Sequence, residues 1–301
     1  MKGIVVFLLT GVMFWNMENF FDFLDGGAGE SDTEFSSRGD RHWTRKRFDA
    51  KCNAVAKTIL WLGEAEGTLP DVIGVAEVEN RFVVRQVLER TALRKLDYGI
   101  VHFDSPDPRG IDCALLYRSS RLRLVESKPC RVSAEGLLTR DILLAQFVEA
   151  GTGDSLVVLV NHFPSKYGGG QTDWRRGVAV RRLKEVCDSL RAEGWIRQVA
   201  VGDFNDSPAN PLFATLEPSL SLCRKTGREQ GSIRFNGQWE LIDLCFVSPE
   251  LRDRTGFRVV EVPFLTERDA AHSGEKPLRT YSGPRYLGGV SDHRPIIVRI
   301  E

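Results

Sequence analysis

The segment VAVGDFNDSP at residues 199–208 places polar side chains directly after an apolar run. Asp203 and Asn205 stand two positions apart, and side chains two apart in an extended chain share one face. A carboxylate and an amide on one face can hold a hard divalent cation or move a proton. Pro208 prevents a strand from continuing, so the segment alone is equally typical of a strand-end site and of a plain turn.

The same arrangement recurs along the chain, which favours the site over the turn. Apolar runs at residues 12–15, 72–76 and 156–160 each end on a group that can bind metal or move a proton. A further pair of such groups stands just before the apolar run at residues 295–300. The residues at these positions are Asn16, Glu77, Asn161, His162, Asp292 and His293.

One acidic residue lies inside an apolar run. Asp243 stands between Ile242 and Leu244 in the strand-like segment at residues 241–247. Because an isolated buried charge is very costly, this carboxylate needs a partner. His293 in turn needs an acceptor that orients one of its ring nitrogens.

Six short segments together resemble the endonuclease/exonuclease/phosphatase superfamily, the DNase-I-like metal-dependent phosphohydrolases. They occur in the order of that family and span nearly the whole chain. The segments are WNMEN at 15–19, VAEVEN at 75–80, NHFPS at 161–165, GDFN at 202–205, ID at 242–243 and SDH at 291–293. Two further pieces, RGID at 109–112 and GGVSDH at 288–293, are most similar to a bacterial subgroup with no assigned substrate.

The resemblance implies a Mg²⁺ site, with Mn²⁺ as the alternative. Mg²⁺ requires near-octahedral oxygen ligands at about 2.0–2.1 Å and keeps several waters. Glu77 is then the anionic ligand, Asn16 supplies a neutral oxygen beside it, and Asp292 faces this metal or a second one. Glu79 falls on the opposite strand face, where we expect a solvent or loop residue.

The resemblance also implies catalytic roles. Asp203 is the general base that positions and deprotonates a water, and Asn205 orients that water or binds a phosphoryl oxygen. His162 donates to a non-bridging oxygen as charge grows in the transition state. Asp243 and His293 pair with each other, which satisfies both side chains.

Basic residues near these segments are candidate contacts for phosphate or the leaving group. They are Arg140, Lys166, Arg175 and Arg176. A run of charges is also typical of a solvated face, and the sequence leaves both interpretations open. Nothing in their spacing decides whether four further residues line the cleft, namely His42, Asp112, Arg279 and Tyr281.

These residues favour a divalent-metal-dependent phosphoesterase that attacks phosphorus with an assisted water. The chain has no Cys-x5-Arg loop that would supply a covalent nucleophile. A phosphodiester in nucleic acid is the first substrate expected, and a small phosphomonoester or a phospholipid or inositol-phosphate head group is the second. A binding module that lost catalysis is the alternative from another class. The formal net charge of zero excludes steering of polyanions by the whole protein.

The elements that must position these residues follow from periodicity. Residues 44–63 carry apolar positions at Phe48, Cys52 and Val55, a helical stripe whose basic neighbours, Lys51 among them, we expect on a solvated face. Further helices are expected at residues 80–93 and 173–194. The expected strands lie at 98–103, 113–117, 122–125, 142–148, 156–160, 197–202, 241–247, 257–262 and 295–300.

Strands that are adjacent in sequence, with few helices between them, indicate largely antiparallel pairing. We therefore expect an α+β fold, with two packed mixed or antiparallel sheets flanked by helices in the four-layer DNase-I-like sandwich that the resemblance implies. No linker interrupts residues 1–301, so one domain and a monomer are expected. The six cysteines show no metal-binding spacing and are expected to be buried.

The N-terminus leaves two interpretations open. Lys2 and the apolar run at residues 4–9 resemble a short signal peptide, in which case residues 1–11 are a signal or a disordered leader and the protein is exported. The run lacks an A-x-A cleavage site and continues into Trp15, so the alternative is a first core strand in a cytoplasmic protein, although we expect export. The whole apolar stretch, from this run to Trp15, has roughly 10–12 residues and is too short to span a bilayer.

Overall fold

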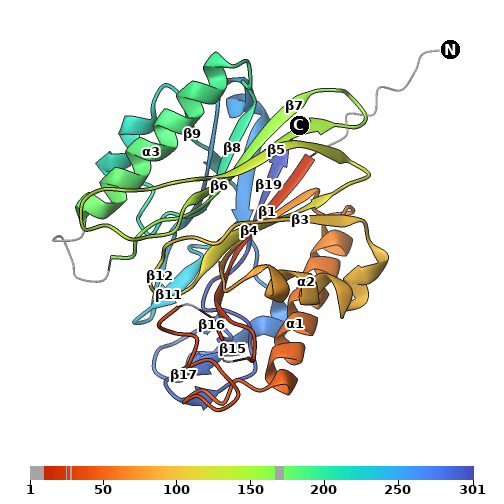
Figure 1. Cartoon of the computed structure of the whole chain (residues 1–301), viewed down its shortest axis with the longest axis vertical. Coiled ribbons are helices and arrows are strands. Elements are labelled where there is room, and N and C mark those ends of the chain that lie inside the picture. Colours follow the sequence, from red (N-terminus) through yellow and green to blue (C-terminus); the bar gives the residue numbers. More distant parts are fainter. Residues whose placement is uncertain (1–9, 25, 28, 167–172) are drawn as a thin grey trace.

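The structure, a computed structural model, describes residues 10–24, 26–27, 29–166 and 173–301. Two β-sheets pack face to face, with α3 on one outer face and α1 and α2 on the other (Figure 1). The expected four-layer α+β sandwich is confirmed. Residues 1–9, which hold most of the expected leader, lie outside the described residues, whereas Thr10 and Gly11 already belong to the first strand.

The first sheet has the strand order β10-β14-β19-β1-β2-β4-β3. The strand β1 lies at its centre, parallel to β2 and antiparallel to β19. All but one of the residues of β1 are buried, because both of its faces are covered. The bounds are β1 (Thr10–Phe20), β2 (Val72–Val78), β3 (Tyr98–His102), β4 (Asp112–Arg118), β10 (Arg224–Lys225), β14 (Thr255–Val259) and β19 (Ile296–Ile300).

The second sheet has the strand order β5-β6-β7-β8-β13-β9. In β8, Asp203 is in register with His162 on the parallel neighbour β7 and with Asp243 on the antiparallel neighbour β13. Three predicted site residues therefore lie side by side at one edge of this sheet. The bounds are β5 (Leu122–Cys130), β6 (Ile142–Glu149), β7 (Ser155–His162), β8 (Gln198–Asp203), β9 (Ser221–Leu222) and β13 (Asp243–Val247).

The two sheets approach closely behind the site. A Cβ atom added to Gly74 would lie only 2.9 Å from a methyl carbon of Val160 on the facing sheet, so a larger side chain would force the layers apart. All six cysteines are buried and free, as expected. None of the helices in the described part of the chain is both long and apolar enough to cross a membrane.

Three α-helices cover the sheets at nearly the predicted positions. Thr44 and Asn80 cap the first two helices, because their side chains accept hydrogen bonds from the backbone amides of Arg47 and Val83. The helix bounds are α1 (Arg45–Ala65), α2 (Arg81–Glu89) and α3 (Asp173–Ala192). Short 3-10 helices occupy η1 (Ala92–Lys95), η3 (Pro211–Leu216), η4 (Pro249–Arg254) and η5 (Pro263–Leu265).

Three short hairpins were not anticipated from the sequence, because their strands have only two or three residues, which is too few to establish a periodic pattern. The first of them is bridged to His293 through Ile233. This bridge fixes the loop that carries His293 to the mouth of the site. The pairs are β11 (Ile233–Phe235) with β12 (Gln238–Glu240), β15 (Thr266–Arg268) with β16 (Glu275–Pro277), and β17 (Tyr281–Ser282) with β18 (Arg285–Tyr286).

Candidate active site

Polar side chains from both sheets meet at one end of the sandwich, where β2, β7 and β8 end and β13 and the segment before β19 begin. The structure brings together Asn16, Glu77, His162, Asp203, Asp243 and His293, which are the core of the predicted set. Each of these side chains is at most 13% exposed or belongs to a buried residue. Their electrostatic interactions are therefore weakly screened by water.

Asn16 links the carboxylates of the two sheets. Its Nδ2 donates to Oε1 of Glu77 at 3.2 Å and to Oδ2 of Asp203 at 3.1 Å, while its Oδ1 accepts from the backbone amide of Glu18 at 2.9 Å. We predicted that this amide oxygen binds metal; here it accepts from the Glu18 amide, and its role as a metal ligand stays a prediction. Two neighbouring carboxylates need a donor between them, and Asn16 supplies it.

Glu77 stands on a strained stretch of backbone. Its φ angle is +60°, a left-handed conformation that non-glycine residues seldom adopt, and the β2 register shifts at this position. The strain redirects the side chain so that Oε2 accepts from the backbone amide of Asn19 at 2.8 Å and Oε1 lies 3.7 Å from Nε2 of His162. Glu77 therefore faces the cleft, where it can bind a cation.

Asp243 and His293 form the contact that the sequence predicted. Nδ1 of His293 lies 2.7 Å from Oδ2 of Asp243, and the two side chains are 6% and 1% exposed. Burial by itself lowers the pKa of His293, but the Asp243 carboxylate outweighs it and holds that pKa well above its ordinary value. His293 is therefore an imidazolium at neutral pH, and its Nε2 lies 3.8 Å from Oδ2 of Asp203.

His162 has the opposite charge state. Burial, together with the Arg140 and Arg109 guanidinium groups, holds the pKa of His162 well below its ordinary value. Its Nε2 lies 3.7 Å from both Oε1 of Glu77 and Oδ2 of Asp203. Because only an N–H group can face two carboxylates favourably, Nε2 carries the proton of this neutral ring.

Asp203 lies between the two histidines. Burial, aided by the Asp243 carboxylate, raises the pKa of Asp203 to about 7 against the opposing effects of His293 and Asn16. Its Oδ1 accepts from the backbone amide of Asn205 at 2.9 Å. A carboxyl group that titrates near neutral pH is suited to accept a proton from water. The side chain of Asn205 donates to the carbonyl of Phe163 at 2.9 Å, which fixes it beside the same cleft.

Two further acidic side chains, Glu18 and Asp292, extend the cleft, and the sequence predicted a role only for Asp292. Nη2 of Arg279 lies 3.1 Å from Oδ2 of Asp292, and its Nε lies 2.7 Å from Oε1 of Glu18. Burial, and then the Asp292 carboxylate, raises the pKa of Glu18 to about 7. Glu18 lies in the WNMEN segment, so the sequence held a signal for it, although we assigned it no role.

Lys51 was expected on a solvated helix face, and the structure contradicts this. Its side chain is buried, and Nζ donates to the Glu18 carbonyl at 2.7 Å and to Oγ1 of Thr280 at 2.8 Å. Burial lowers the pKa of Lys51 to about 8, against the attraction of Glu18 and Glu77. A lysine beneath two acidic residues stabilises a cleft that would otherwise carry excess negative charge.

The donor set fits a hard divalent cation. Carboxylates of Glu18, Glu77, Asp203 and Asp292 lie around one cleft, and Mg²⁺ prefers oxygen ligands of this kind. Burial raises the pKa values of Glu18 and Asp203 to about 7 in spite of Lys51, Arg279 and His293, so a bound cation would stabilise their ionised forms.

Two of the four predicted substrate contacts are instead structural. Arg140 is buried and donates to Asp107 at 2.7 Å and to the carbonyls of His162 and Phe163 at 3.2 and 2.7 Å. Its guanidinium therefore holds the end of β7 in place, which contradicts its expected role as a free phosphate ligand.

Arg176 is likewise not the free phosphate ligand that we predicted. It is buried, its Nε lies 3.0 Å from Oδ2 of Asp206, and it also contacts Asp173. Lys166 and Arg175 remain at the rim. Nζ of Lys166 lies 3.6 Å from Asp206, and the exposed Arg175 lies over the ring of Trp174.

Glu79 is not the solvent residue that we expected. Its carboxylate accepts from the backbone amide of Asp22 at 2.6 Å, and burial, with the neighbouring Asp22 and Asp32 carboxylates, raises the pKa of Glu79 to about 8. The bulge at Glu77 removes the simple alternation on which the expectation depended.

Comparison with known proteins shows the family and the fold. Nocturnin from Rattus norvegicus is 28% identical over 160 residues, which are 48% of this chain and 34% of that protein, so the chain aligns with about a third of the relative. The human Nocturnin catalytic domain, solved with a bound sulfate anion, is 18% identical with a TM-score of 0.61, covering 97% of this chain and 94% of that one.

A mannosyl-6-phosphatase from Bacteroides thetaiotaomicron is 17% identical with a TM-score of 0.62, covering 97% of this chain and all of that one. At these identities the two structures show a shared fold. The family model for the Endonuclease/Exonuclease/phosphatase family matches residues 11–301. The chain therefore belongs to the endonuclease/exonuclease/phosphatase family, whose members are phosphoesterase hydrolases.

Proposed function

We propose that the protein is a Mg²⁺-dependent phosphodiesterase that acts on nucleic acid. The observation that carries the proposal is the pair of histidines whose Nε2 atoms lie 3.7 and 3.8 Å from Oδ2 of Asp203, one with its pKa lowered by burial and the other with its pKa raised by Asp243. A neutral ring can donate one hydrogen bond, and an imidazolium adds a positive charge. Together they complement a phosphoryl group that gains negative charge in the transition state.

Each side chain then has a defined task. Asp203 accepts the proton of the attacking water, because its pKa of about 7 leaves a large ionised fraction at neutral pH. Nε2 of His162 donates to a non-bridging oxygen, and the imidazolium of His293 stabilises the charge on another. Glu77 and Asp292 are the carboxylates that would hold Mg²⁺, which when bound neutralises phosphoryl oxygens.

A basic groove next to the site supports a substrate with more than one phosphate. The groove has a volume of about 490 Å³, and its lining includes Arg109 and Arg175 together with Asp107, which lies 3.5 Å from Nε of Arg109. Arg109 lies close enough to lower the pKa of His162, so the groove and the reaction centre share one positive field. In a polynucleotide a neighbouring phosphate would enter this field, and the exposed Trp174 beneath Arg175 offers a ring for a base.

The second candidate is a phosphomonoesterase or an enzyme for lipid or inositol head groups. The similarity to a mannosyl-6-phosphatase fold favours it. A small monoester would leave the groove at Arg109 and Arg175 largely empty, and for that reason we place it second.

The test is a substrate panel assayed with the purified full-length protein. Plasmid, single-stranded oligonucleotides, bis-(nitrophenyl) phosphate, inositol phosphates and sugar phosphates are each incubated with Mg²⁺, with Mn²⁺ and with a chelator. We expect the highest kcat/KM on oligonucleotides and no turnover with chelator. Higher kcat/KM on monoesters would establish the second candidate, and no turnover of any substrate would indicate a binding module. Turnover that persists with chelator would refute metal dependence.

A further inference from the structure

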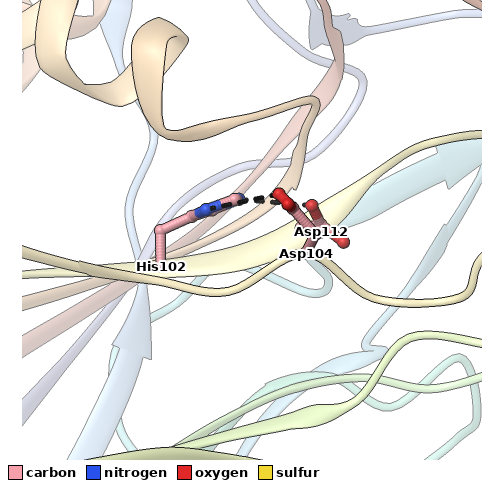
Figure 2. A group of neighbouring side chains, drawn as sticks. All are labelled: His102, Asp104 and Asp112. Carbon is pink, nitrogen blue, oxygen red and sulfur yellow. Dashed lines mark ion pairs between the residues drawn. The ribbon is translucent and has the colours of Figure 1, made fainter. Parts of the chain in front are cut away.

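A second group of side chains that could hold a metal ion lies where β3 ends and β4 begins, and Asp112 of this group is in register with Val78, the residue after Glu77. His102 ends β3, Asp112 begins the adjacent strand β4, and Asp104 stands in the loop between them. Figure 2 shows the imidazole edge of His102 directed at both carboxylates. One ligand atom from each of the three residues lies within 4.8 Å of the others.

The carboxylates of this group have no arginine or lysine partner among the described residues. In the part of the chain that the structure describes, no arginine or lysine nitrogen lies within 4.0 Å of Asp104 or Asp112. The side chain of Asp112 is only 5% exposed. Other buried aspartates do have such a partner, for example Asp107 with Arg140 at 2.7 Å. A buried carboxylate without a basic residue beside it is costly, so a cation is the missing partner that this position favours.

The imidazole supplies an independent observation. The side chain of His102 is 3% exposed, and its Nε2 makes no hydrogen bond within the described residues. The atom lies 3.2 Å from Oδ2 of Asp112, but this contact lacks the alignment of a hydrogen bond. A buried ring nitrogen without a hydrogen bond is unfavourable unless another group binds it. A nitrogen and an oxygen that lie this close without forming a hydrogen bond can instead both bind one metal ion between them.

We propose that His102, Asp104 and Asp112 bind a divalent transition-metal ion, Zn²⁺ or Mn²⁺, at a site separate from the catalytic cleft. One imidazole and two carboxylates suit these borderline ions better than Mg²⁺, which prefers oxygen ligands alone. Ligand atoms of a tetrahedral Zn²⁺ with bonds of about 2.0–2.1 Å lie roughly 3.3 Å apart, close to the separation of His102 and Asp112. The side chain of Asp104 is 91% exposed, so it can reorient freely until its carboxylate reaches the ion.

The ion closes the loop at residues 103–111 on itself, because Asp104 and Asp112 stand at its two ends. The loop is already held in part, since the backbone amide of Ser105 donates to Oδ1 of Asp112 at 2.9 Å. Asp107 in this loop binds Arg140, which supports the carbonyl of His162. The proposed metal is therefore structural, and it stabilises a loop that contacts the active site without taking part in the reaction.

Titration of Zn²⁺ and of Mn²⁺ into the metal-free full-length protein, in excess Mg²⁺, tests the proposal by calorimetry. We expect one site that Mg²⁺ does not occupy. His102→Gln should abolish it, and Asp104→Asn should weaken it at least about tenfold, because each removes a ligand. Since Asp104 is exposed, its variant should fold even if His102→Gln does not.

Two control variants locate the site. His272→Gln alters an exposed histidine that lies 3.3 Å from Asp269, and Glu77→Gln alters the catalytic cleft. Both chains should retain the site with unchanged affinity. In the unaltered chain, bound Zn²⁺ should also slow hydrogen exchange across residues 103–111. The absence of any site in excess Mg²⁺, or equal affinities in Asp104→Asn and the unaltered chain, would overturn the proposal.

Discussion

The contact between Asp243 and His293 allows a quantitative test of the proposed reaction. The substitution Asp243→Asn keeps the size of the side chain but removes the charge that faces Nδ1 of His293 at 2.7 Å. An amide can also present its NH2 group to the ring, so both the charge and the fixed orientation of the imidazole are lost. Folding should be retained, because the volume inside β13 does not change.

The expected loss of rate follows from this geometry. A hydrogen bond to a charged group contributes about 1.5–3 kcal/mol, which alone corresponds to roughly 10- to 150-fold. The loss of the imidazolium and of its orientation adds to this, since the pair is buried and weakly screened. We therefore expect kcat/KM to fall by about 10²- to 10⁴-fold, or about 2.7–5.4 kcal/mol of transition-state stabilisation.

The pH profile should change in a defined direction. The Asp243 carboxylate holds the pKa of His293 well above its ordinary value, so the native imidazolium persists through neutral pH. In the Asn variant, burial lowers that pKa with less opposition, and the charge is lost as pH rises through it. The deficit relative to the native enzyme should therefore be smaller near pH 6 than near pH 8.

The assay is kcat/KM on the best substrate of the panel for both single variants, Asp243→Asn and His293→Ala, and for the double variant. We expect the double variant to be little worse than either single one, because the two residues act as a unit. Asp49→Asn, which alters an exposed pair with Arg45 on α1, serves as the control and should remain within about twofold of the native rate. Losses that multiply in the double variant, or a pH profile parallel to the native one, would refute the reasoning.

Three further substitutions separate ligand, structural and packing roles. Glu77→Gln should abolish most turnover and weaken Mg²⁺ in a calorimetric titration, and an unchanged titration would remove Glu77 from the metal site. Arg176→Met should lower the free energy of unfolding in urea by about 1–3 kcal/mol while the folded enzyme stays active, because the buried Asp206 loses its 3.0 Å partner and keeps only Lys166 at 3.6 Å as a cationic neighbour. Gly202→Ala should prevent stable folding, since a Cβ would lie 2.1 Å from the Asn161 carbonyl oxygen, and a native thermal midpoint would contradict this.

The sequence predicts most of the fold because apolar periodicity reports burial. The long strands and all three α-helices lie within a few residues of the predicted ranges, since each has a sustained pattern and a clear cap or turn. The short hairpins between β11 and β18 could not be predicted in this way. Their strands pair over only two or three residues, and contacts such as that of Ile233 with His293 form only in the folded chain.

The candidate site could be predicted in its residues but not in its contacts. Types and order along the chain place Glu77, Asp203 and His293 together, since each stands at the end of a buried strand. Whether a charged side chain binds substrate or another part of the protein depends on which partner lies opposite. Arg176 meets Asp206 and Lys51 meets Glu18 through contacts between distant segments, and neither contact has a local signal in the sequence.

Backbone strain explains why strand alternation failed at the site itself. Of the six non-glycine residues with positive φ in the described part of the chain, four belong to the cleft, namely Glu18, Asn19, Glu77 and Asn205. Each such conformation costs on the order of 1–3 kcal/mol and persists only where surrounding structure enforces it. Here the buried strands anchor both sides of each strained residue. Hydrogen bonds from Asn16, Asn19 and Asn205 to carboxylates stabilise the strained backbone conformation. The strain thus directs acidic side chains into one cleft before any cation binds, which lowers the cost of assembling the site.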